Sequence, residues 1–170
     1  RSVEDMLEAA RKKMEENKNT PVSWLYCRGW NEENFENPRY PHKDELDSLS
    51  SEIPIIMVRV CGHVAVCNTP GLEKLQKIKE FDEIAKDVNL ETGLIKENAV
   101  QFYYSVLDAP TQAEVENYIK YSVKKLNKCG FTGIQSDDLG ALPGKNWKRI
   151  MNAYKALDER GELNLRHYEQ

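Results

Sequence analysis

Hydrophobic side chains recur at helical spacing in three stretches of the chain. Residues 3–16 place apolar side chains three or four positions apart with charged side chains between them, and residues 111–128 and 147–157 repeat that pattern. Thr111, followed three positions later by Glu114, forms a capping box, and Gly130 is a typical helix stop. We predict a helix in each of the three stretches.

Four short segments are typical of strands: "VSWLYCRGW", "IPIIMVRV", "FTGIQ" and "LNLRHYEQ". The second segment is a continuous apolar run, as in parallel strands that are buried on both faces. It runs into a Cys-Gly-His turn and then, beyond Asn68 and Pro70, into a helix. "DELDSLSSE" predicts a short helix, and the pattern from residue 70 to 100 is weak, with a turn expected at Gly93.

Strands that alternate with helices predict an α/β fold made of parallel βα units. With about four strands and four helices, the 170 residues are expected to form a single α/β segment. They could complete a small doubly wound sheet. Because a (β/α)8 barrel needs eight strands and roughly 250 residues, they could instead form about half of a barrel.

Composition narrows the class of protein. The chain is 40% hydrophobic with a formal net charge of -4, and the charges form no basic stripe, so nucleic acid is not an expected partner. Its longest apolar stretch is interrupted by Arg59 and His63, which argues against a transmembrane helix. The four cysteines form no CxxC pair, so we expect reduced thiols and a cytoplasmic location. The first residue is Arg, which predicts a segment cut from a longer chain.

Candidate chemistry gathers where the predicted strands end, as it does in parallel βα folds. The four strand ends carry Arg28 and Trp30; Cys61 and His63; Gln135, Ser136, Asp137 and Asp138; and His167, Tyr168 and Glu169. Imidazole and carboxylate groups are suitable ligands for zinc or iron. However, the chain has three histidines and no HxH, HExxH or CxxC motif, so a complete site would need distant partners.

Each candidate also has a structural interpretation. A histidine after a glycine is commonly a hydrogen-bonded turn residue, and the two aspartates could cap the loop backbone. Cys61 and His63 could form a nucleophile–base pair, but no third residue to orient the histidine is identifiable. The aromatic stripe of Tyr118, Trp147 and Tyr154 is explained by packing.

The order of several short blocks resembles the YtcJ-like amidohydrolases, the amidohydrolase family 3 metal-dependent hydrolases. These blocks are "GWNEENF", "RYPHKDELD", "IPIIMVRVCGHVAVCNTPGLEKL", "TGLIKENAV", "NKCGFTGIQSDDL" and "YKALDERGELNLRHYEQ". The resemblance covers nearly the whole chain. It implies the central part of a metal-binding (β/α)8 barrel, with the HxH ligands before this segment and further His and Asp ligands after it.

The resemblance also implies roles for individual residues. His63 and Asn68 match family positions beside the active site, and Trp30 matches a block at the pocket mouth. Glu97 matches a carboxylate near the metal, while Lys96 keeps a carbamylated-lysine ligand possible. Many relatives carry Asp at the position of Ser136, so either Asp137 or Asp138 could take that substrate-binding role. Many relatives have an aliphatic residue at the position of His167, which favours a local role for it.

The resemblance implies hydrolysis of an amide-type or formamide-type C–N bond by water that a divalent metal activates, with zinc expected first and iron second. The family includes N-substituted formamide deformylases and proteins labelled exoenzyme regulatory proteins. A non-catalytic regulatory module is therefore the alternative. We expect the segment alone to be inactive and to hold no metal, and to expose apolar surface that favours self-association or a homodimer.

Overall fold

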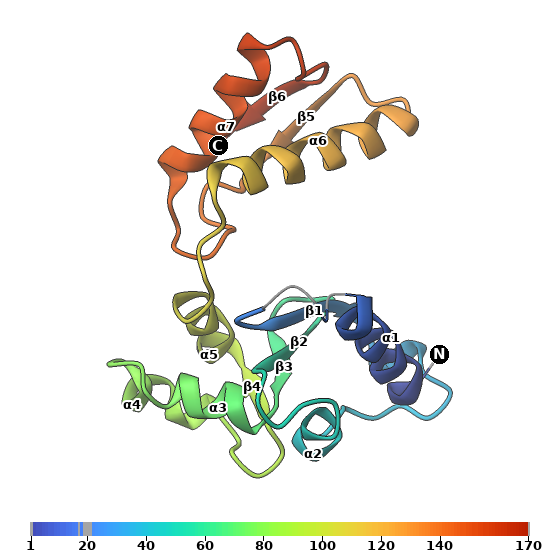
Figure 1. Cartoon of the computed structure of the whole chain (residues 1–170), viewed down its shortest axis with the longest axis vertical. Coiled ribbons are helices and arrows are strands. Elements are labelled where there is room, and N and C mark those ends of the chain that lie inside the picture. Colours follow the sequence, from blue (N-terminus) through green and yellow to red (C-terminus); the bar gives the residue numbers. More distant parts are fainter. Residues whose placement is uncertain (1, 17, 19–21, 170) are drawn as a thin grey trace. The chain divides into compact units, whose positions relative to one another are not determined.

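The computed structural model describes residues 2–16, 18 and 22–169, which divide into two compact units, Arg1–Leu107 and Asp108–Gln170 (Figure 1). The first unit holds helices α1 (Val3–Glu16), α2 (Lys43–Asp47), α3 (Thr69–Leu75), α4 (Phe81–Ile84) and α5 (Glu97–Phe102). Its strands are β1 (Leu25–Trp30), β2 (Ile55–Arg59), β3 (Val64–Cys67) and β4 (Leu94–Lys96), and its 3-10 turns are η1 (Glu32–Asn34), η2 (Ala85–Asp87) and η3 (Tyr103–Ser105).

The first unit is a four-stranded sheet in the order β1-β2-β3-β4, covered on both faces. Successive residues of β2 alternate between the two faces. Ile55 and Met57 pack with side chains of α1 and α2, whereas Ile56 and Val58 pack with those of α3, α4 and α5. Burial of both faces explains the unbroken apolar run of this strand, as predicted.

The prediction of parallel βα units is wrong for most of this sheet. Only β1 and β2 are parallel, and both β2–β3 and β3–β4 are antiparallel. The chain reverses between Arg59 and Val64 at Gly62, whose φ of +78° suits a tight turn. The segment after the Cys-Gly-His turn is therefore a third buried strand, β3, before the chain enters α3.

The second unit follows the predicted pattern. It consists of α6 (Gln112–Lys128), β5 (Gly133–Ser136), α7 (Trp147–Glu159) and β6 (Arg166–Glu169). Strands β5 and β6 are parallel and joined through α7, a βαβ unit. The Thr111–Glu114 capping box is present, and Gly130 adopts a φ of +84° just past α6.

The two strands of this unit have one helix-facing side and one bare side. Ile134, Ser136, His167 and Glu169 are half-buried, whereas the residues between them are exposed. The core of the unit joins side chains of α6 and α7, such as Ile119 and Leu157, to Leu165 before β6. The side chains at the carboxyl ends of β5 and β6 thus lie at the edge of this core.

The predicted helices at 3–16, 111–128 and 147–157 and the four predicted strands are confirmed. No closed barrel is present in the described residues, and the position of the chain within one barrel domain stays a prediction. Among the described residues, no helix is long and apolar enough to cross a membrane.

Candidate functional site

The carboxyl ends of β5 and β6 bring four polar side chains together. Ser136 and Glu169 are register partners in the parallel pair, and His167 lies on the same side of β6 two residues earlier. Asp138 follows β5, and its backbone N–H donates to Glu169 Oε1 at 2.9 Å. Parallel pairing therefore assembles a cluster from residues about thirty positions apart in sequence.

Ser136 is the centre of this cluster. Its Oγ lies 3.1 Å from Asp138 Oδ1 and 2.7 Å from Glu169 Oε2, and it also hydrogen-bonds His167 Nε2. A hydroxyl has one proton to donate and two lone pairs. All three contacts are satisfied when Ser136 donates to Glu169 and accepts from His167 and from a protonated Asp138.

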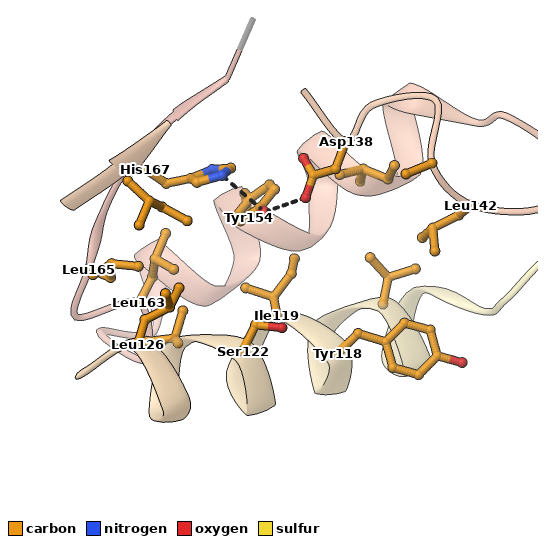
Figure 2. Close-up of a pocket in the computed structure, with 15 residues that line it drawn as sticks. Tyr118, Ile119, Ser122, Leu126, Asp138, Leu142, Tyr154, Leu163, Leu165 and His167 are labelled. Carbon is orange, nitrogen blue, oxygen red and sulfur yellow. Dashed lines mark hydrogen bonds between the residues drawn. The ribbon is translucent and has the colours of Figure 1, made fainter. Parts of the chain in front are cut away.

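Tyr154 of α7 completes the cluster from the helix side. Its ring stacks on the imidazole of His167, with centroids 4.1 Å apart and an interplanar angle of 25°. Its hydroxyl donates to Asp138 Oδ2 at 3.3 Å and lies 3.2 Å from His167 Nε2 (Figure 2). The sequence pattern assigned Tyr154 to packing alone. The signal that could have found it is the phenol hydroxyl, which needs a polar partner when its ring is buried.

The electrostatics of the cluster agree with this proton assignment. Burial, followed by the hydrogen bond and charge of Glu169, raises the pKa of Asp138. Burial also opposes ionisation of Glu169, but hydrogen bonds from Ser136 and Asp138 outweigh it and lower the pKa of Glu169. Burial and then the charge of Asp138 raise the pKa of Tyr154. Asp138 is thus the favoured site for a proton, and Glu169 the favoured site for negative charge.

The structure distinguishes between the two predicted aspartates. The side chain of Asp137 is exposed, whereas Asp138 is half-buried within the cluster. Of the two, Asp138 alone lies where it could contact a bound molecule together with His167. Glu169, which the sequence marked only as a residue at a strand end, is its closest acidic neighbour.

His63 and Glu97 lie together in the first unit. His63 Nδ1 is 3.4 Å from Glu97 Oε2, and the two side chains are 66% and 65% exposed. Strand pairing between β3 and β4 places Lys96 beside Val64 and lets the Glu97 N–H donate to His63 O at 2.9 Å. The sequence selected these residues separately. Glu97 adopts a φ of +43°, a left-handed conformation that is uncommon for a residue other than glycine.

The Cys61–His63 pair does not have the geometry of a nucleophile and its base. The contact between them runs from the backbone N–H of His63 to Cys61 Sγ at 3.4 Å. The imidazole instead faces Glu97.

Asn68 has a structural role that differs from the predicted substrate contact. It is fully buried at the start of α3. Its Oδ1 accepts from the N–H groups of Ile55 and Gly71 at 2.7 and 3.1 Å, and its Nδ2 donates to the carbonyls of Ser50 and Ile53 at 3.0 and 2.9 Å. All the hydrogen-bonding positions of this amide are filled, so none is left for a substrate.

Trp30 is likewise a core residue. It is 7% exposed, its Nε1 donates to Met57 O at 3.1 Å, and its ring packs edge-on against Tyr40. The ring is thus buried against β2 and Tyr40, and its predicted position at a pocket mouth stays a prediction.

Among the described residues, one group could offer three ligand atoms to a metal. Atoms of Asp138, His167 and Glu169 all lie within 4.8 Å of one another. One imidazole and two carboxylates are a suitable mixture for a divalent ion. In the structure, His167 and Asp138 hydrogen-bond Ser136 and Tyr154, and Glu169 hydrogen-bonds Ser136 and the Asp138 N–H. In the described residues the group serves as a hydrogen-bonded network at the ends of β5 and β6.

Comparison with known proteins assigns the family. A model of the amidohydrolase family, Amidohydro_3, matches residues 1–168. The chain belongs to this family. It is 30% identical over 144 residues to the putative amidohydrolase YtcJ of Bacillus subtilis strain 168, a match that covers 81% of this chain and 27% of YtcJ. The predicted resemblance to YtcJ-like amidohydrolases is therefore confirmed.

Two solved structures share the fold of this amidohydrolase-family chain. Both are described as uncharacterised metal-dependent hydrolases, one from Pyrococcus furiosus and one from Pyrococcus horikoshii OT3. Their TM-scores are 0.64 and 0.61 at 20% and 21% identity, over 99% of this chain. The chain spans 31% and 30% of their lengths, so it corresponds to less than a third of the relatives that it matches.

Proposed function

We propose that this chain is part of a longer metal-dependent hydrolase that cleaves a C–N bond of the amide or formamide type. The observation that carries the proposal is the family match over residues 1–168, together with a fold shared with two metal-dependent hydrolases. A divalent ion in such an enzyme lowers the pKa of its bound water and polarises the carbonyl. Zinc is the first candidate and iron the second.

The principal metal ligands are expected outside residues 1–170. The chain contains three histidines and no HxH motif. In the described residues, the histidine beside Glu97 is His63, which gives two ligands where a catalytic zinc site has three protein ligands.

The role proposed for this chain is to contact the substrate. His63 supports it best, because its imidazole is exposed and is oriented by Glu97. A substrate carbonyl could accept a hydrogen bond from this imidazole, with the carboxylate holding the ring in position. Asp138 stays a predicted contact as well, with its carboxyl held by Ser136 and Tyr154.

The proposal is tested with the product of the whole gene and with residues 1–170 alone. We expect the whole product to release amine from N-substituted formamides or N-acyl amines, to lose this activity on chelation and to regain it with zinc. The His63→Asn variant should raise KM about tenfold through loss of a substrate contact, and Asp137→Asn, a change at an exposed aspartate, should not.

Residues 1–170 alone are compared with the whole gene product. The short chain should show no amidase activity and retain less than about a tenth of an equivalent of zinc after dialysis. Hydrolysis that survives metal removal, or a full equivalent of zinc on residues 1–170, would refute the proposal. The gene on either side should encode an upstream HxH and a downstream His and Asp. Their absence would favour the regulatory module instead.

We also propose that the isolated chain self-associates and that the protein is cytoplasmic. In the described residues β5 and β6 form a two-stranded sheet, so each has an edge without a partner strand, which supports self-association of the isolated chain because such edges pair readily with other chains. Light scattering of residues 1–170 against concentration tests this. A cytoplasmic location is proposed because all four cysteines are free thiols.

A further inference from the structure

A cavity of about 190 Å³ lies inside the second unit, between its two helices and its strands (Figure 2). Ten of its fifteen lining residues are aliphatic, contributed by α6, α7, β5 and the segments beside them. They include Ile119, Leu126, Leu142 and Leu165, which are labelled in Figure 2. An unfilled apolar cavity destabilises a core in proportion to its volume, so a cavity of this size favours an occupant.

One end of the cavity is polar. Asp138, Tyr154 and His167 line it, with the Tyr154 hydroxyl between the other two polar groups (Figure 2). Tyr118, another lining residue, is half-exposed, and its hydroxyl points away from the polar end (Figure 2). The cavity therefore combines mainly apolar walls, interrupted by the Ser122 hydroxyl on α6, with a cluster of hydrogen-bonding groups at one end and a wall that reaches the surface.

The polar end carries more acidic than basic groups. Glu169 accepts from the Asp138 N–H, and in the described part of the chain neither carboxylate has a lysine or arginine within ion-pair distance. The basic side chain within reach is His167, whose Nε2 lies 3.3 Å from Glu169 Oε2. A cation that entered the cavity would pair with Asp138 at this end, whereas an anion would face the charge of Glu169.

We propose that this cavity binds a small molecule with an aromatic or branched apolar body and one protonated amine, which pairs with the carboxylate of Asp138. Since an apolar cavity of about 150 Å³ holds benzene, about 190 Å³ holds a ring with a short amine arm. The ammonium donates to Asp138 and to the Tyr154 oxygen, and the ring contacts the aliphatic walls. The proton that it displaces from Asp138 passes to solvent.

The amine site shares Asp138 with the predicted substrate contacts, but the proposed hydrolysis rests on the family match and on His63. The amine site lies on the helix-facing side of β5 and β6, and binding is measured without turnover. Failure of ligand binding therefore leaves the hydrolase proposal intact, and the reverse also holds.

The test is titration calorimetry on residues 1–170 with three probes of similar size. These are 2-phenylethylamine, the uncharged propylbenzene and the anionic 3-phenylpropionate. We expect the amine to bind with a stoichiometry of one, propylbenzene about tenfold more weakly, and the anion not at all. Equal affinity for amine and hydrocarbon, or no binding of either, would overturn the proposal.

Variants assign the binding to the cavity. Asp138→Asn should weaken the amine about tenfold and leave propylbenzene unchanged, whereas Asp137→Asn, the matched exposed control, should change neither. Leu126→Phe should block both probes by filling the cavity. If the circular dichroism spectrum shows that Asp138→Asn is not folded, Tyr154→Phe is measured in its place. Its affinity for the amine should fall threefold or more (about 0.6 kcal/mol), and its affinity for propylbenzene should not change. An amine affinity that is unchanged in Tyr154→Phe or in Leu126→Phe would refute the assignment.

Discussion

Replacement of Asn68 by alanine should remove much of the stability of the first unit. The substitution leaves the buried N–H groups of Ile55 and Gly71 without an acceptor, and the carbonyls of Ser50 and Ile53 without a donor. An unsatisfied buried donor costs about 1.5 kcal/mol, and a partly buried carbonyl that can recruit water costs about 0.5 kcal/mol. The expected loss is therefore about 4 kcal/mol, a large share of the roughly 5–15 kcal/mol by which an ordinary domain is stable.

The assay is urea unfolding followed by tryptophan fluorescence in a Trp147→Phe background. The remaining tryptophans, Trp24 and Trp30, both lie in the core of the first unit and report on it alone. Asn98→Ala is the matched control, since Asn98 is exposed on α5 of the same unit. A loss below about 1 kcal/mol for Asn68→Ala would refute the structural role of this amide.

The Asn68→Asp variant tests the same four hydrogen bonds through the pH dependence of stability. Its carboxylate could still accept from the two N–H groups, but its second oxygen would face two carbonyls. Burial and these carbonyls raise the folded-state pKa above the ordinary value of about 3.9. The folded state therefore holds a proton that the unfolded state releases, and stability falls as pH rises through that window. The variant should be closer to the parent protein at pH 4 than at pH 8, and an equal deficit at both would contradict this account.

Three other outcomes are expected. Gly93→Ala should destabilise the first unit by about 3 kcal/mol or more in urea unfolding, because a Cβ there would lie 2.4 Å from Cys67 O at a φ of +79°. Iodoacetamide at pH 7.5 should alkylate Cys61 first and Cys67 last by peptide mass spectrometry. A hydrogen bond from Arg59 lowers the pKa of the exposed Cys61 thiol, and burial raises the pKa of Cys67 to about 12. Glu32→Gln should reduce the loss of urea resistance between pH 6 and pH 3. A hydrogen bond from Arg59 lowers the pKa of Glu32 from its ordinary value of 4.5. The stability that the ionised Glu32 provides is therefore lost as pH falls below that value.

Controls for these outcomes come from the same chain. Gly130 has a similar φ, but in the described residues no atom other than those of its chain neighbours lies within 4 Å of a Cβ built there. Gly130→Ala should therefore lower the stability by about 1 kcal/mol. Arg59→Gln should slow alkylation of Cys61, and the exposed Cys129 provides the reference thiol. Glu36→Gln should leave the acid sensitivity unchanged. Comparable losses for the two glycines, alkylation of Cys67 at the rate of Cys129, or equal acid profiles for Glu32→Gln and its control would each contradict the corresponding argument.

The sequence predicted the elements with strong periodicity and failed where topology depends on distant partners. The stripe of α6 and its capping box are local features, so they were predicted correctly. The short strands β3 and β4 were missed, because their few apolar residues resemble a turn or a helix start until Gly62 reverses the chain. An apolar run such as β2 reports burial on both faces and carries no information on the direction of its neighbours.

The candidate site was predictable in part for the same reason. Asp138 and His167 were marked because they follow strands, and parallel pairing of β5 and β6 brings them together. Tyr154 was missed because its position in an apolar helical stripe is fully explained by packing. Asn68 was assigned to the active site because it matches a family position there, and a match in sequence does not tell whether the amide is free or bonded to the backbone.

The tight reversal at Gly62 also determines which contacts of the first unit are local. Strands β2 and β3 are joined by four residues, whereas β1 and β2 pair in parallel across more than twenty. Closing a short loop is fast and costs less entropy, so we expect the β2–β3 hairpin to form early and β1 to join late. In pulsed hydrogen exchange during refolding, amides of β3 should gain protection before those of β1. A ribosome would then release β1 well before its partner strand exists, and this strand would expose its apolar Leu25 and Trp30 to aggregation until β2 is made.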